Sequence, residues 1–129
     1  MVLSAADSIG TPHNILTDTN GRMIQISKGE AAPILRYKAL NLASELTVWT
    51  PAAGKKFVLT DIILSSPALG NCILRDNTAG DRIMHIEMLA NTTFNHAFIT
   101  PVVSATANNV LTAEASAATQ RITVCGYEI

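Results

Sequence analysis

From residue 34 to the end of the chain, apolar and polar residues alternate in short runs separated by turn residues. The clearest run is "RIMHIEMLA" (82–90), in which three apolar residues share one face while His85 and Glu87 share the other. This period of two is typical of a β-strand with one face buried. A helix is disfavoured because the flanking Gly, Asn and Thr leave the run shorter than a usual helix. The pattern therefore predicts a strand.

Turns rich in Gly, Pro, Asn and Asp, such as "PAAG" (51–54) and "NTAGD" (77–81), divide the chain into similar runs. The strand-like runs are residues 34–43, 45–50, 55–66, 72–76, 82–90, 92–100, 108–116 and 120–129. In the first of them, Leu35, Tyr37 and Ala39 share one face. No segment has a convincing helical period. We expect an all-β fold, a jelly-roll-like β-sandwich of about eight strands with an extended N-terminal arm.

One run, "FVLTDIIL" (57–64), is apolar on both sides. In a regular strand its apolar residues divide between two faces, Phe57, Leu59 and Ile63 on one and Val58, Ile62 and Leu64 on the other. The core of a sandwich covers one face of a strand. The pattern alone does not say what covers the second.

Residues 1–30 differ from the rest, because they mix Ser, Thr, Asp, Asn, Gly and Pro with only short apolar patches. They have too little apolar content to form a core of their own. Two interpretations remain open, a passive terminus and an arm that docks onto a neighbour's sheet edge or a groove on a shell. The residues for such a contact are Ile15, Leu16, Met23, Ile24 and Ile26. We expect an arm of residues 1–30 and a sandwich domain of residues 31–129.

Composition points toward an assembly. The 129 residues suit one domain. Charged residues make up 15% of the chain, against about 25% in typical domains, and the mean hydropathy is +0.27.

A net charge of −1 with no basic run argues against nucleic-acid binding. No apolar run approaches the roughly 18 residues of a membrane span, and no secretory signal is recognisable, so synthesis in a cytoplasm is the simplest expectation.

Residues able to carry chemistry are sparse. Common catalytic motifs such as G-x-S-x-G and H-E-x-x-H are missing. His85 and Glu87 share a strand face and His96 falls on the next strand, a pattern related to the metal ligands of cupin-type jelly rolls, but the His-x-His pair of cupins is lacking. Solvent-facing alternation explains these residues without a metal. We expect no enzyme, and no catalytic, cofactor or metal site.

Four further residues have alternative interpretations. Aromatic residues are only 5% of the chain, which disfavours a glycan-binding platform, although Trp49 lies beside a turn. Asp61, between apolar neighbours, is expected to bind backbone amides. Cys72 and Cys125 are expected to be free, buried thiols, although both lie in strand-like runs and pairing remains geometrically open.

Two segments carry a family resemblance. "TVWTPAAGKKFVLTDIILSS" (47–66) and the closing "ITVCGYEI" (122–129) resemble small bacteriophage virion proteins of jelly-roll type, and the similarity covers about residues 45–66 and 120–129. The resemblance implies a structural protein, commonly trimeric, of the head or the tail. A trimer would also cover the second face of the strand 57–64, so we expect Val58, Ile62 and Leu64 to line a subunit interface.

Three functions follow from the resemblance and the pattern. The first is a homotrimeric capsid decoration (cement) protein on the capsid surface of the virion, which staples subunits of the major capsid protein of a phage head. The second is a phage tail or fibre component that binds a host receptor. The third is a metal-dependent enzyme or sugar-binding module of cupin or lectin type. The sequence does not separate the first two.

Overall fold

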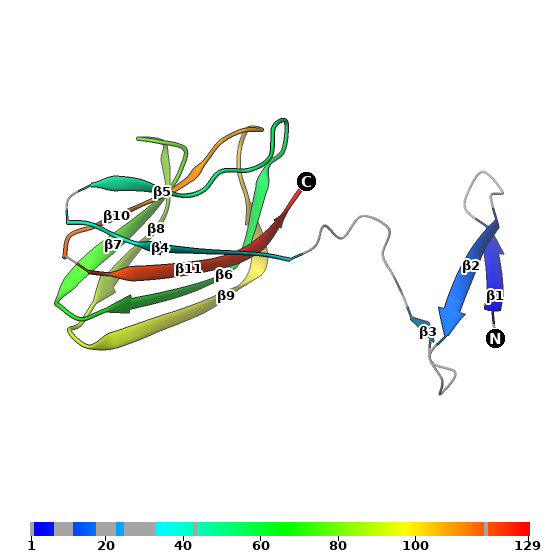
Figure 1. Cartoon of the computed structure of the whole chain (residues 1–129), viewed down its shortest axis with the longest axis horizontal. Coiled ribbons are helices and arrows are strands. Elements are labelled where there is room, and N and C mark those ends of the chain that lie inside the picture. Colours follow the sequence, from blue (N-terminus) through cyan, green and yellow to red (C-terminus); the bar gives the residue numbers. More distant parts are fainter. Residues whose placement is uncertain (1, 7–11, 18–22, 25–32, 43, 118) are drawn as a thin grey trace. The chain divides into compact units, whose positions relative to one another are not determined.

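The structure, a computed structural model, describes residues 2–6, 12–17, 23–24, 33–42, 44–117 and 119–129 (Figure 1). Within these ranges every regular element is a β-strand, and there is no helix that would span a membrane. The chain divides into two compact units, residues 1–30 and residues 31–129.

The first unit contains three short antiparallel strands in the order β1-β2-β3, namely β1 (Val2–Ala6), β2 (Pro12–Thr17) and β3 (Met23–Ile24). Leu16 is paired with Val2 on one side and with Ile24 on the other. Of the residues predicted to contact a shell or neighbour, Ile15, Leu16, Met23 and Ile24 therefore belong to strands that pair with one another. Ile26 lies outside the described residues. Their contact with another molecule stays a prediction.

The second unit is a sandwich of two antiparallel sheets (Figure 1). Its described strands are β4 (Ile34–Ala39), β5 (Glu45–Trp49), β6 (Phe57–Ser66), β7 (Gly70–Asp76), β8 (Asp81–Met88), β9 (Thr92–Val103), β10 (Leu111–Ala115) and β11 (Arg121–Glu128). One sheet has the order β5-β10-β7-β8 and the other β4-β11-β6-β9. We call them the β5/β8 sheet and the β4/β9 sheet after their edge strands. Strands β4 to β7 alternate between the sheets, and so do β8 to β11, which is a jelly-roll winding. The predicted fold class is confirmed.

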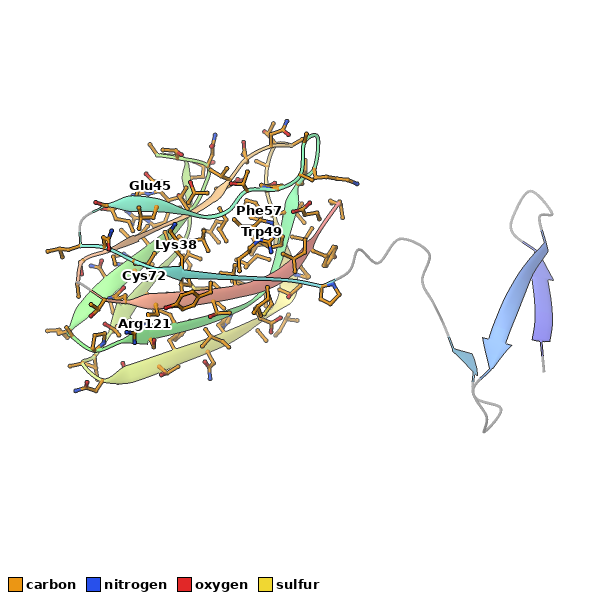
Figure 2. The ribbon with its side chains drawn as sticks, viewed as in Figure 1. Lys38, Glu45, Trp49, Phe57, Cys72 and Arg121 are labelled. Carbon is orange, nitrogen blue, oxygen red and sulfur yellow. The ribbon has the colours of Figure 1, made fainter. Side chains whose placement is uncertain are left out.

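The core lies between the two sheets and consists of apolar residues from both. Its largest fully buried apolar side chains are Leu40, Trp49, Phe57, Leu59, Ile62, Leu64, Leu74, Leu111 and Ile122. The ring centroids of Trp49 and Phe57 lie 6.0 Å apart (Figure 2). The Trp49 indole also donates a hydrogen bond of 2.9 Å to Glu128 Oε1. Trp49 is therefore a core residue and does not form an exposed glycan platform.

A buried amide interrupts this apolar interior. Gln120 is 0% exposed, and its side-chain nitrogen and oxygen have no hydrogen-bond partner in the part of the chain that the structure describes. An amide buried without partners loses its hydrogen bonds to water and gains none in return, which destabilises the folded state.

Strand β6 contains a β-bulge that reverses its two faces. On the neighbouring β11, Cys125 pairs with Asp61 and Gly126 with Leu59, so Thr60 is one residue too many. The extra residue shifts the alternation, and Ile62 and Leu64 therefore point into the core together with Phe57 and Leu59.

The predicted interface residues are consequently covered within the single chain. Ile62 is 1% and Leu64 0% exposed, so assigning them to an outward face was wrong, because a strict period of two had been applied across the bulge. Val58 is also only 1% exposed and lies between its cross-strand partners Tyr127 and Val103. Ile63, at 45% exposure, faces outward instead.

Candidate functional site: the outer face of the β4/β9 sheet

The polar residues considered as metal ligands do not form a joint site. His85 Nε2 and Glu87 Oε1 lie 3.1 Å apart on β8. His96 is on β9, in the other sheet, with its ring 6.0 Å from that of Phe94 and 4.7 Å from that of Phe98. Among the described residues there is no group of three His, Cys, Asp or Glu placed to hold a metal ion.

Two cross-strand rows of side chains lie on the outer face of the β4/β9 sheet, and both contain large exposed apolar residues. One row runs Leu35, Cys125, Asp61 and Ala97, and the next runs Tyr37, Thr123, Ile63 and Asn95. Because Ile62, Val124 and Ile122 point into the core, these alternate positions point outward. Leu35 is 62%, Tyr37 59% and Ile63 45% exposed. Such a face is costly in water unless another surface covers it.

Strand β4 has cations on its inner side and large apolar residues on its outer side, the reverse of the usual arrangement in a sandwich. Its cations Arg36 and Lys38 pair with the core residues Val124 and Ile122 and so share the inner side, whereas Leu35 and Tyr37 lie outside. Inward charges on an edge strand oppose the addition of a further strand. The apolar side of β4 is thus available for contact through side chains, while its backbone edge is protected.

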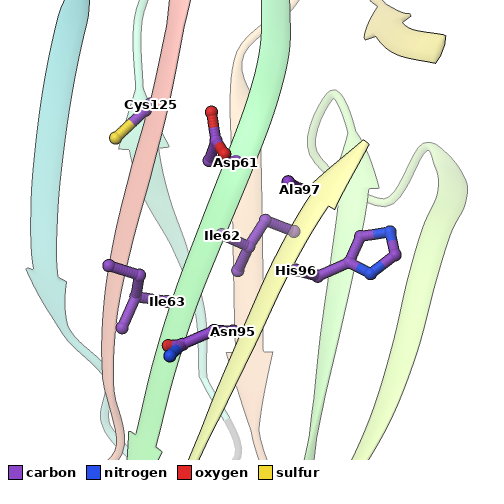
Figure 3. Close-up of a pocket in the computed structure, with 7 residues that line it drawn as sticks. All are labelled: Asp61, Ile62, Ile63, Asn95, His96, Ala97 and Cys125. Atoms are coloured by element: carbon purple, nitrogen blue, oxygen red, sulfur yellow. The ribbon is translucent and has the colours of Figure 1, made fainter. Parts of the chain in front are cut away.

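A shallow hollow of about 380 Å³ lies on the same face (Figure 3). It is lined by Asp61, Ile62, Ile63, Asn95, His96, Ala97 and Cys125, from β6, β9 and β11. The register between β6 and β9 shifts here, since Leu59 pairs with Val102 but Asp61 with Ala97. Ala97 and Cys125 have small side chains, and in Figure 3 the His96 ring points away from Asp61 and Cys125. The hollow is therefore a depression beside the larger Ile63.

The carboxylate and the thiol of the hollow both interact with neighbouring groups. The Thr60 hydroxyl donates a hydrogen bond of 2.7 Å to Asp61 Oδ2. Partial burial raises the pKa of the Cys125 thiol, and the Asp61 carboxylate raises this pKa further. A thiol with a raised pKa is protonated at neutral pH and is a poor nucleophile. The chemistry of the hollow thus favours contact over reaction.

The two cysteines lie in different sheets and differ in exposure. Both are free thiols, as the sequence predicts, but Cys125 is partly exposed, so the expectation that both are buried was wrong for Cys125. Cys72 belongs to β7 in the β5/β8 sheet and is 0% exposed, and burial raises the pKa of its thiol to about 12. Cys125 faces outward on the other sheet.

The sequence did not allow the apolar outer face and its hollow to be predicted, for two reasons. The alternation of Leu35, Tyr37 and Ala39 was visible, but a period of two shows which residues share a face and not which side is the core. The hollow depends on the shifted register of β6 and β9, and no simple sequence signal marks that shift.

Comparison of the chain with protein-family models, curated proteins and solved structures finds no match. The resemblance of residues 45–66 and 120–129 to phage virion proteins therefore stays a prediction.

Proposed function

We propose that the chain is a structural virion protein, a homotrimeric decoration protein that lies over junctions between major capsid subunits of a phage head and staples them. The observation that carries the proposal is the outer face of the β4/β9 sheet, where Leu35, Tyr37 and Ile63 are 62%, 59% and 45% exposed. Large apolar side chains grouped on one face mark a surface that another protein covers.

Two further features support an assembly role. Charged residues are only 15% of the chain, which suits a subunit whose surface is largely in contact with neighbours. The hollow on the apolar face has a protonated thiol and a hydrogen-bonded carboxylate, groups that suit binding better than catalysis. In a trimer each weak contact with a shell occurs three times, so modest contacts add up to strong attachment.

The test is binding of the full-length protein to undecorated heads assembled from the major capsid protein encoded in the same genome. Sedimentation of heads with fluorescently labelled protein should show saturable binding in multiples of three copies. A parallel sample with intact host cells tests the alternative, a tail or fibre component that binds a host receptor. Binding to cells and not to heads would replace the decoration function with that alternative. Binding to neither would refute both.

A matched pair of variants connects this binding to the apolar face. Ile63→Asp places a charge on the outer face of the β4/β9 sheet, while Thr47→Asp places one on β5, at an exposed position of the other sheet. We expect Ile63→Asp to abolish trimer formation and to weaken head binding, because three-fold attachment is lost. Thr47→Asp should bind like the unmutated protein.

A further inference from the structure

We propose that one end of the sandwich, where loops carrying exposed leucines lie together, inserts into the surface of an uncharged (zwitterionic) lipid bilayer. This contact goes beyond the proposed function and does not depend on the oligomeric state of the chain. It needs no membrane-spanning segment, because only the loop tips enter the bilayer.

Four connections between strands lie at the same end of the sandwich (Figure 1). In the β4/β9 sheet, the last residues of β4 and β6 are aligned with the first residues of β9 and β11. In the β5/β8 sheet, the first residues of β5 and β7 are aligned with the last residues of β8 and β10. The connections formed by residues 40–44, 67–69, 89–91 and 116–120 are therefore neighbours. We call this surface the leucine end.

Three of these connections carry a protruding leucine. Leu42 is 56%, Leu69 72% and Leu89 68% exposed, and each belongs to a different connection. A protein partner would need a separate pocket for each of the three side chains. The hydrocarbon of a bilayer receives each side chain independently, because the hydrophobic effect is non-directional. Three single protrusions therefore suit a fluid apolar phase.

The leucine end also lacks charge. Residues 40–44, 67–69, 89–91 and 116–120 contain no Asp, Glu, Lys, Arg or His, whereas the connection between β5 and β6 at the opposite end contains Lys55 and Lys56. Interfaces between proteins keep charged residues at their rim. A charge that enters hydrocarbon is costly. The lack of charge in all four connections thus favours a bilayer over a protein partner.

Polar groups in two of the leucine-bearing connections are hydrogen-bonded within the chain. The Ser66 hydroxyl donates a hydrogen bond of 2.6 Å to the Ala68 carbonyl. The Thr92 hydroxyl donates one of 2.6 Å to the Leu89 carbonyl. A partner protein offers hydrogen bonds of its own, but hydrocarbon offers none, so a backbone group that enters it must be bonded internally. These bonds lower the cost of dehydrating the loops.

The first charges behind the leucine end have both signs. They are Lys38 and Arg121 on the β4/β9 sheet and Glu45, Glu87 and Glu114 on the β5/β8 sheet. Anionic lipids attract clusters of cations, and this set is no such cluster. The bilayer that matches the leucine end is therefore one without net charge.

Sedimentation with phosphatidylcholine vesicles tests the contact in the full-length chain. We expect binding at both low and high salt, because burial of leucine does not depend on attraction between charges that salt screens. Combining Leu42→Ser, Leu69→Ser and Leu89→Ser should weaken binding by at least about a hundredfold, since burial of the exposed part of each leucine contributes roughly tenfold.

The matched control is Ile99→Ser. Ile99 is 102% exposed on β9, away from the leucine end, and its replacement should leave vesicle binding unchanged. Circular dichroism verifies that each variant is folded. Three results would overturn the proposal: no vesicle binding by the unmutated chain, binding that disappears at high salt, or equal binding by the folded triple variant.

A dye on a loop tip provides a test that does not require the triple variant to fold. Leu69→Cys and, as a control at the opposite end, Thr78→Cys are made in a Cys125→Ala background and labelled with a nitrobenzoxadiazole dye. Cys72 is buried and stays unlabelled in the folded protein. Phosphatidylcholine vesicles with nitroxide-bearing acyl chains should quench the dye of the Leu69→Cys variant and not that of the Thr78→Cys variant. Equal quenching of both, or no quenching of the first, would show that the leucine end does not enter the bilayer.

Discussion

Ile62 and Ile63 are adjacent on β6 but face opposite ways, so replacing each with alanine separates folding from assembly. Ile62 is 1% exposed in the core, and Ile63 is 45% exposed on the outer face. Truncating a buried isoleucine to alanine removes apolar contacts and leaves a cavity, which costs about 2–5 kcal/mol of unfolding free energy. We expect a loss of this size for Ile62→Ala.

The expected cost of Ile63→Ala is smaller and of a different kind. Complete burial of an isoleucine side chain contributes roughly 1.5–3 kcal/mol, and about half of Ile63 is already covered within the chain. Its truncation should therefore cost an isolated subunit about 1 kcal/mol. A further cost of about 1 kcal/mol for each contact should appear only when subunits associate, because the exposed half is then buried.

Urea unfolding at two protein concentrations measures both effects. Trp49 is the single tryptophan of the chain and is 1% exposed, so its fluorescence reports unfolding of the sandwich. The unfolding midpoint of an associating protein rises with protein concentration. We expect this rise for the unmutated chain and for Ile62→Ala if it remains folded, and a weaker rise for Ile63→Ala. A loss for Ile63→Ala as large as that for Ile62→Ala at low concentration would show that the assignment of the two faces is wrong.

Three further predictions concern individual side chains. Gln120→Leu should raise the unfolding free energy by about 1–3 kcal/mol in thermal or urea unfolding, because it removes a buried amide without partners, and a destabilised variant would contradict this. Hydrogen bonds from Trp49 and from the Ala52 amide lower the pKa of Glu128 from 4.5. Its contribution to stability is therefore present above about pH 4.5 and is lost as the pH falls through the lowered pKa. Glu128→Gln should show a weaker fall in unfolding free energy between pH 5 and 3 (about the range in which carboxylates titrate) than the unmutated chain, and equal falls would refute this role. Cys72 should react with a thiol reagent at pH 8 only on unfolding, because burial raises its pKa to about 12, while Cys125, on the outer face, should react faster than Cys72 in the folded monomer that Ile63→Asp is expected to give. Two thiols that react equally fast would contradict the structure.

The fold was predictable because alternation and turn residues act locally. The run 82–90 was predicted as a strand with Met84, Ile86 and Met88 inward, and β8 (Asp81–Met88) buries Ile86 and Met88 and packs a partly buried Met84 against the core. The eight predicted runs correspond to β4 through β11, with differences mainly at their ends. Local alternation decides these strands because each one has a face in the core.

The site was predictable only in part, because it depends on backbone irregularities and on which side of a sheet meets the core. The bulge at Thr60 exchanged the faces of Ile62 and Ile63, and one extra residue in a strand has no reliable local signature. The excess of apolar residues in 57–64 was interpreted as a subunit interface, but Val58, Ile62 and Leu64 are covered within the single chain. The exposed apolar side chains of the β4/β9 sheet also come from its edge strands, with Leu35 62% and Tyr37 59% exposed on β4 and Ile99 102% exposed on β9.

The central claim is that the outer face of the β4/β9 sheet holds copies of this chain together. Multi-angle light scattering of the unmutated chain, Ile63→Asp and Thr47→Asp tests it most directly, with circular dichroism to verify that each variant is folded. We expect trimers for the unmutated chain and for Thr47→Asp, and folded monomers for Ile63→Asp, because a charge on the covered face has no partner there. A monomeric unmutated chain, or a trimer that survives Ile63→Asp unchanged, would contradict the claim.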